Sequence, residues 1–453
     1  MLSAMRKLAV VLVVAALLAL AWFGVRRGVN HHAWNAAADY EAAQRAAKEA
    51  GLELDFKRAL PTAPPEQNAG PDYRAFVAWA RSADKAEREA YGIAASGRVG
   101  SRLVSDTEAS QAIAAIRPAL EIAERALTKP KCAFERDWSD PVGTLLPEYA
   151  DMKQLAKIMA SEARLHAKAG RREATLRALT GIRRVSEHAD DEPILIATLV
   201  SVAIRAIADH TLLEVVEAQP QWAGDPAFVA LTEATPRDLR AGLPGEVAFA
   251  QSVDFGDAQL MRHFTSEGQP QEGEAPMPKL DDFTYRLVDR DALRKGVTAR
   301  LLRFYTDFYV AADPKHDLPT RFKAIRDLET QLQAQAKKEG LVGKRVELFA
   351  PIMAGWVQSV GREQARTAMM PAILEIVAKM GPRPKFDARP PTMPIDPWTG
   401  MPCLFEATAG EGFRFRSFGA NGVDDMGQGD DVEVSFPTSF KRPKQPMSDS
   451  PTA

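Results

Sequence analysis

The strongest constraint on the fold of this chain is an apolar run close to its N-terminus. Two basic residues precede eighteen uncharged residues, Leu8 to Val25, and two arginines follow them. As an α-helix rising 1.5 Å per residue, this run would reach about 27 Å, close to the ~30 Å hydrocarbon core of a bilayer. The sequence therefore predicts a signal-anchor transmembrane helix over residues 1–27.

Two other interpretations of this run remain open. One is a cleaved signal peptide, with Leu8 to Leu18 as its apolar region and Ala19-Leu20-Ala21 as its cleavage site. The other is a buried core helix. Apolar residues continue past the cleavage site to Val25, which favours the uncleaved anchor. We expect a single-pass protein of the inner (cytoplasmic) membrane with its bulk extracytoplasmic, or periplasmic; secretion after signal cleavage is the alternative.

Charge and motifs exclude several classes of protein. The 453 residues carry 58 basic and 60 acidic side chains, so the near-neutral balance predicts no nucleic-acid partner. No phosphate-binding loop, dinucleotide fingerprint, HExxH helix or GxSxG elbow occurs. The sequence singles out no catalytic residue and no organic cofactor, which favours a protein that is not an enzyme. Cys132 and Cys403 could pair in an oxidising compartment or remain two unrelated buried thiols.

The central part of the chain has the apolar periodicity of helices. Residues 148–169 have one apolar face, and a second stripe runs from Leu176 to Val185, with Gly170 between them. A short connection containing glycine predicts an antiparallel hairpin, similar to one unit of a tetratricopeptide-like repeat. The run Ile194 to Ala208 is apolar on nearly all sides. This is typical of the central helix of a bundle and, alternatively, of a second membrane span.

The predicted fold is mainly α: an irregular helical bundle or a helical-hairpin repeat-like body, with a small C-terminal antiparallel β module. Helices are expected at 33–50, 105–127 with a break at Pro118, 281–311, 318–339 and 346–379, the last interrupted at Gly361 and Pro371. The predicted divisions are a first helical lobe at 33–264, a surface loop at 266–279, a second helical lobe at 281–380, the β module at 390–437 and a disordered tail at 438–453.

Three features of the helical body are candidates for chemistry. His188 with the acids Asp190 to Glu192 is either a hard-metal cluster or a solvated turn. His166 lies on an apolar stripe and is predicted to be a hydrogen-bonded packing residue. The aromatic cluster at 304–309 is either core packing or a groove for a ligand or partner.

The C-terminal segment changes from helical to strand-like composition. Strands are predicted at Cys403–Glu406, Phe413–Phe418 and Val432–Phe436. The loop before the last strand holds Asp424, Asp425, Asp430 and Asp431 among several glycines. Four carboxylates in one loop repel each other unless they are solvated or bind a hard cation such as calcium.

The segment also resembles a known family. Asp396-Pro397-Trp398, the run Ser417 to Gly422 and Asp430-Asp431-Val432 are similar to the C-terminal module of the type II secretion major pseudopilins, which has a DPWG turn, a small antiparallel sheet and a calcium-binding loop. The resemblance implies calcium ligands at Asn421, Asp430 and Asp431, with Asp424 and Asp425 as further candidates. The body resembles uncharacterised membrane-anchored helical bacterial proteins that end in the same module.

These observations predict a non-enzymatic, membrane-anchored, extracytoplasmic envelope protein. Its helical body would bind a protein partner of the envelope, and calcium would stabilise its C-terminal module. Two alternatives remain: an envelope enzyme with a site in the helical body, and an accessory protein of a secretion apparatus.

Overall fold

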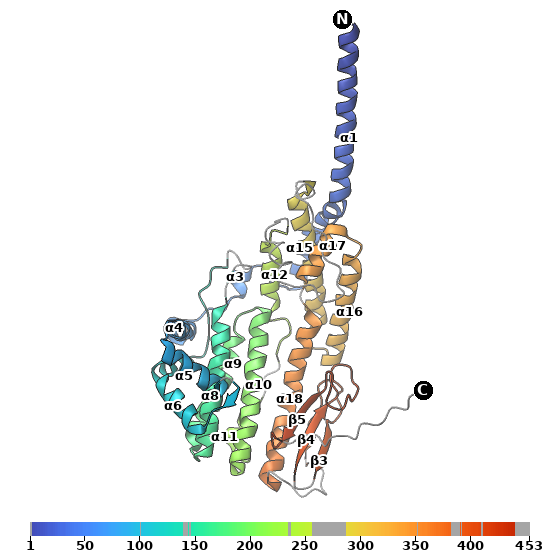
Figure 1. The fold of residues 1–453 in the computed structure, drawn as a ribbon. Helices are drawn as coiled ribbons and strands as arrows, with labels where there is room; N and C mark the ends of the chain where they lie inside the picture. The colour runs from blue at the N-terminus through green and yellow to red at the C-terminus, as the bar shows by residue number, and fades with distance from the viewer. Residues whose placement is uncertain are drawn as a thin grey trace, which may run out of the picture.

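The structure is a computed structural model that shows a mainly α protein with a small C-terminal β module, as the sequence predicts (Figure 1). The described residues are 2–99, 101–138, 144, 146–233, 237–255, 287–350, 352–381, 390, 392–408 and 411–439; for residues 2–13 only the helical backbone is described. The predicted loop at 266–279 and almost all of the predicted tail lie outside these residues.

The N-terminal helix α1 (Leu2–Ala38) is continuous over 37 residues. Its first part extends alone beyond the rest of the protein (Figure 1). Its last part packs on α15 (Arg290–Ala311), where the buried Asn30 side chain donates a 2.8 Å hydrogen bond to the Leu287 carbonyl and accepts one of 2.6 Å from the Asp289 amide. The predicted separate helix over 33–50 is therefore wrong at its start: α1 continues to Ala38, and α2 (Tyr40–Glu49) follows after one residue.

Three long helices form the centre of the first core: α8 (Pro147–Lys168), α9 (Arg172–Ala189) and α10 (Leu195–Ala218). The predicted hairpin is confirmed, and Gly170 adopts a positive φ of 67° between α8 and α9. Among the residues whose side chains are described, which leaves out the first part of α1, α10 is the one helix found long and apolar enough to cross a membrane. It packs against α8, α9 and α18, and 56% of its most apolar 18-residue stretch is buried. Both observations favour a central core helix.

Shorter elements surround these helices. Ser105 caps one of them through a reciprocal bond pair with Glu108, and the helical path breaks at Ile116, just before Pro118, as predicted. The elements are α3 (Phe56–Ala59), η1 (Pro65–Gln67), α4 (Gly70–Ser82), α5 (Lys85–Ser96), β1 (Arg98–Val99), β2 (Arg102–Leu103), α6 (Asp106–Ala115), α7 (Arg117–Leu127), η2 (Pro220–Trp222) and α11 (Pro226–Ala230).

The later helices form a second core together with the end of α1 and with α2. They are α12 (Leu243–Ser252), α15, α16 (Leu318–Ala336), α17 (Gly340–Phe349) and α18 (Met353–Met380). The predicted interruptions at Gly361 and Pro371 are wrong, because α18 is helical through both. Tertiary packing outweighs the local preference here: the Trp398 ring lies against Gly361, at a place where a Cβ would come within 2.1 Å of it.

The β module is a three-stranded antiparallel sheet in the order β3-β4-β5: β3 (Leu404–Thr408), β4 (Gly412–Ser417) and β5 (Val432–Phe436). Phe413, Phe415 and Phe436 are fully buried in the first core, whereas Trp398 belongs to the second core and contacts Phe322 of α16, with ring centroids 5.4 Å apart. The module therefore joins both cores, and it lies at the end of the protein opposite to the free part of α1 (Figure 1).

Candidate metal site

The β module is organised around the carboxylate of Asp396, which is fully buried. One carboxylate oxygen accepts hydrogen bonds from the Trp398 amide (3.1 Å) and the Ser417 hydroxyl (2.7 Å). The other accepts from the Thr399 hydroxyl (3.1 Å) and the Phe418 amide (3.0 Å). These four bonds compensate the desolvation of the charge and tie the Asp-Pro-Trp turn to the end of β4, where the acidic loop begins.

Close backbone approaches shape the loop between β4 and β5. Gly419 has a positive φ of 65°, and a Cβ there would lie 2.6 Å from backbone atoms of Asp430. The carboxylate of Asp430 in turn accepts a 2.7 Å hydrogen bond from the Asn421 amide. The backbone at Gly419 thus crosses close to the backbone at Asp430, and only glycine fits at this crossing without strain. The crossing brings the start of the loop against its end, so residues nine positions apart become neighbours.

The crossing gathers three of the five predicted ligands. Asp425, Asp430 and Asp431 each offer a carboxylate oxygen, and these oxygens all lie within 4.8 Å of one another. Opposite oxygens around a calcium ion stand about 5 Å apart, because each bond measures 2.3–2.6 Å. The spacing of the triad is therefore compatible with three of the six to eight oxygen ligands that a calcium ion takes.

Asp431 is the most constrained member of the triad. Its side chain is 0% exposed. One carboxylate oxygen accepts a 2.8 Å hydrogen bond from the Gly427 amide, while Oδ1 is buried with no hydrogen-bond partner among the described residues. Burial raises the pKa of Asp431, and the neighbouring Asp424 and Asp425 raise it further. A buried acceptor without a donor is unfavourable, and a bound cation would satisfy it.

The other two predicted residues have different contacts. Asp424 is held by the guanidinium of Arg416, with N–O distances of 2.8 and 3.0 Å. Asn421 donates its side-chain amide to Asp425 (2.8 Å) and accepts from the Val423 amide (2.8 Å) through its side-chain oxygen. In this structure both residues support the loop, and Asp424 lies outside the cluster of carboxylate oxygens.

The candidates in the helical body have structural partners. His188 is buried; its Nδ1 bonds the Tyr73 hydroxyl and its Nε2 the Lys129 carbonyl, both at 2.9 Å, so both ring nitrogens are occupied. Asp191 and Glu192 accept from the Cys132 amide (2.8 Å) and the Arg136 guanidinium (2.9 Å).

The aromatic and cysteine candidates are packing residues too. Phe304, Tyr305 and Phe308 are buried in the second core. Cys132 and Cys403 are buried and unpaired.

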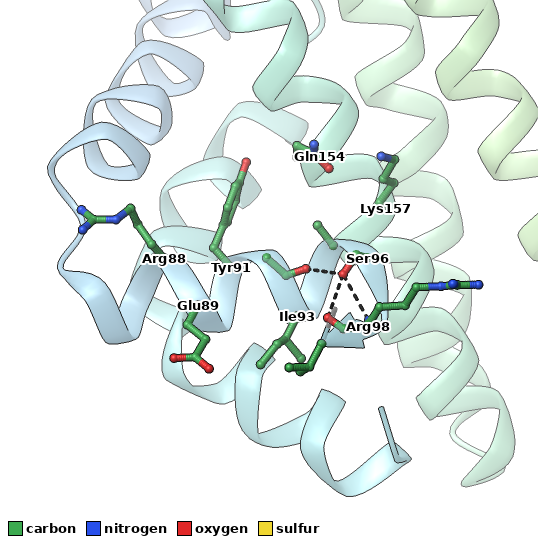
Figure 2. A pocket seen from close by; sticks show the side chains of 11 residues that line it. Arg88, Glu89, Tyr91, Ile93, Ser96, Arg98, Gln154 and Lys157 are labelled. Carbon is green, nitrogen blue, oxygen red and sulfur yellow. Dashed lines mark hydrogen bonds between the residues drawn. The ribbon is translucent and has the colours of Figure 1, made fainter. Parts of the chain in front are cut away.

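A surface hollow of about 490 Å³ lies between α5, β1 and α8. Figure 2 shows Arg88 and Arg98 at its opposite ends, pointing away from each other. Between them, the Ser96 hydroxyl donates to the Gly92 carbonyl (2.7 Å) and accepts from the Arg98 amide (3.1 Å), as the dashed lines mark. The charged groups around this hollow do not converge on one point, so the geometry assigns it no chemistry.

One prediction for the helical body, that of a hydrogen-bonded His166, is wrong. His166 was predicted to be a hydrogen-bonded packing residue, but its Nδ1 is buried without a partner among the described residues, and the ring lines a second groove of about 560 Å³. The helical stripe does place His166 on the inner side of α8. It does not show that α7 and α9 leave space beside the ring.

Comparison of the chain with models of protein families, with curated proteins and with solved structures gave no match.

Proposed function

We propose that this protein is a single-pass, membrane-anchored envelope protein whose extracytoplasmic helical body binds a protein partner and whose C-terminal module is stabilised by calcium. The main observation in support of a membrane anchor is that the apolar part of α1 is exposed. From residue 14 onward, its large apolar side chains are 49–68% exposed: Val14, Leu17, Leu18, Leu20, Trp22, Phe23 and Val25. A contiguous apolar surface of this length is unfavourable in water and is accommodated by a bilayer.

The continuity of α1 supports a rigid connection between anchor and body. The helix enters the second core without a break, with Ala33 and Ala36 buried and Asn30 bonded to the backbone on both sides of Val288. Gly296 of α15 lies against this segment, where a Cβ would come within 3.0 Å of Ala36. A flexible tether would let the body rotate freely, whereas this packing fixes its orientation to the membrane and places the β module at the far end (Figure 1).

Calcium is supported by the geometry of Asp425, Asp430 and Asp431 and by the unpartnered oxygen of Asp431. A ligand that binds only the folded state stabilises it by RT ln(1 + [L]/Kd), about 2.7 kcal/mol at one hundred times Kd. We therefore expect the thermal midpoint of the full chain in detergent to rise with millimolar calcium. Asp430→Asn/Asp431→Asn removes two charges from the site with little change in shape, and it should abolish the rise.

Glu411→Gln is the matched control, because this exposed acid lies in the same module outside the triad. It should keep the full calcium response. An equal response in the wild type and in the double variant would eliminate the proposed metal site.

The anchor is tested separately. We expect the chain to remain in the membrane fraction after alkaline carbonate extraction, and a C-terminal alkaline phosphatase fusion to be active outside the cytoplasm. Replacing Leu17, Leu18 and Leu20 by aspartate should release the protein from the membrane. Recovery of the wild-type chain from the cytosol would overturn this part of the proposal, whatever the outcome of the calcium experiment.

A further inference from the structure

A groove of about 560 Å³ lies between α7, α8 and α9, away from the β module and its acidic loop. This size falls within the range of small-molecule binding sites. Its apolar lining consists of Leu127, Met159, Ala174, Leu176, Ala178 and Gly181.

The lack of a side chain at Gly181 shapes the floor of the groove. The methyl group of Met159 would lie 1.9 Å from a Cβ at this position, and a methyl group of Leu127 would lie 3.1 Å from it. The two side chains therefore fill the place that a larger residue on α9 would occupy, and they give the groove an apolar floor.

The polar rim carries an excess of positive charge. Arg117 is paired with Glu162 (3.2 Å) and also contacts Glu124, and Arg184 bonds Glu187 (2.7 Å). In contrast, the exposed Arg171 and Arg177 form no ion pair within the described part of the chain, and Arg177 lines the groove.

His166 lies close to the positive charges of these arginines. Burial lowers its pKa, and Arg171, Arg177 and Arg117 lower it further, which favours the neutral ring. Its Nδ1 is buried without a partner among the described residues. A buried polar atom left unpaired costs free energy, and a rotation of the side chain that turns Nδ1 toward the groove would let the Nδ1–H tautomer donate a hydrogen bond to an acceptor bound there.

From the apolar floor, the unpaired arginines and the orphaned imidazole nitrogen, we propose that the groove binds an acyl-chain carboxylate. The chain lies on Met159 and Leu127, and the carboxylate accepts hydrogen bonds from His166 and Arg177. An uncharged hydrocarbon would leave the imidazole nitrogen unpaired, and a cationic ligand would face the same arginines. This site is independent of both the anchor and the calcium loop.

The test is photo-crosslinking of the full chain in nanodiscs with dodecanoic acid that carries a diazirine on its chain, followed by peptide mapping. We expect the label on α8 and α9 at the groove, with competition by unmodified decanoate but not by decanol. Mapping separates binding in the groove from partition into the bilayer. Arg171→Gln/Arg177→Gln should lower labelling at the groove roughly fivefold, the upper range for the loss of exposed charge pairing.

Two further variants complete the test. Lys157→Gln removes a charge from the hollow on the other side of α8 and should leave labelling unchanged. Ala174→Trp should fill the groove and abolish labelling. Labelling that is insensitive to the double arginine variant, that decanol suppresses as well as decanoate, or that maps outside α7, α8 and α9 would overturn the proposal.

Discussion

Glu246 provides a test of the packing between α12 and α10. This residue lies in the first turn of α12, and its carboxylate accepts a hydrogen bond from the backbone amide of Leu195, the first residue of α10. Burial raises its pKa from 4.5 to about 7, and the bond from Leu195 offsets part of that rise. The hydroxyl of Tyr305, buried nearby on α15, has no hydrogen-bond partner among the described residues.

The sign and magnitude follow from proton linkage. An acid whose pKa is raised by folding binds its proton more tightly in the native state, so the free energy of unfolding falls as pH rises from about 4.5 to 7. A rise from 4.5 to about 7 corresponds to about 3 kcal/mol, because one pKa unit is worth about 1.4 kcal/mol. Because the side chain is only partly shielded from solvent, we expect about 2 to 3 kcal/mol.

Glu246→Gln keeps an oxygen that can accept the Leu195 bond and removes the charge. We therefore expect the variant to be more stable than the wild type by about 2 to 3 kcal/mol at pH 8 and nearly equal to it at pH 4.5. The measurement is guanidinium unfolding of the full chain in detergent, followed by tryptophan fluorescence at both pH values. The exposed Glu66→Gln serves as the control and should show no such difference. A stability difference between Glu246→Gln and the wild type that is the same at both pH values would refute this account.

Two further substitutions test the packing of the body and of the module. Burial lowers the pKa of His188 to about 4, so the native state binds this proton less tightly than the unfolded state does. The stability that this residue contributes above pH 6.5 should therefore be lost as the pH falls toward 4. His188→Gln should flatten this loss in acid unfolding curves, and it should lower the thermal midpoint at pH 7. Gly361→Ala would place a Cβ 2.1 Å from the Trp398 ring and should cost about 1–3 kcal/mol, measured as a lower thermal midpoint; an unchanged midpoint would show that the contact tolerates displacement.

The elements that were predicted correctly are those whose local and tertiary preferences agree. The α8–α9 hairpin has an apolar stripe on each helix and a glycine in its turn, and β4 and β5 begin and end within one residue of the predicted strands. The predicted helix boundaries are wrong where a contact with a residue distant in sequence determines whether the helix continues. Gly361 stays helical because Trp398 packs on it, and α1 continues past residue 33 because α15 covers its inner face.

The organisation of the cores also depends on contacts between distant segments. The first core contains Phe56 and Tyr73 together with the sheet residues Phe413, Phe415 and Phe436. The second contains Ala33 and Leu52 together with Trp398 and Val432. Each core therefore combines segments from both ends of the chain. Periodicity identifies which face of a helix is buried, but it does not identify the partner of that face.

The acidic loop shows the same limit at the scale of single residues, because the sequence treats Asp424 and Asp425 as equivalent. The structure separates them: Asp424 pairs with Arg416, whose side chain is only 3% exposed, whereas Asp425 joins the triad. Asp424→Asn should therefore lower the thermal midpoint with and without calcium, since it removes one of the two carboxylates, Asp424 and Glu406, that bond this buried guanidinium. Asp425→Asn should leave the calcium-free midpoint nearly unchanged and weaken the calcium response. The reverse pattern in a calcium titration of the two midpoints would show that the ion binds at Asp424 and displaces Arg416.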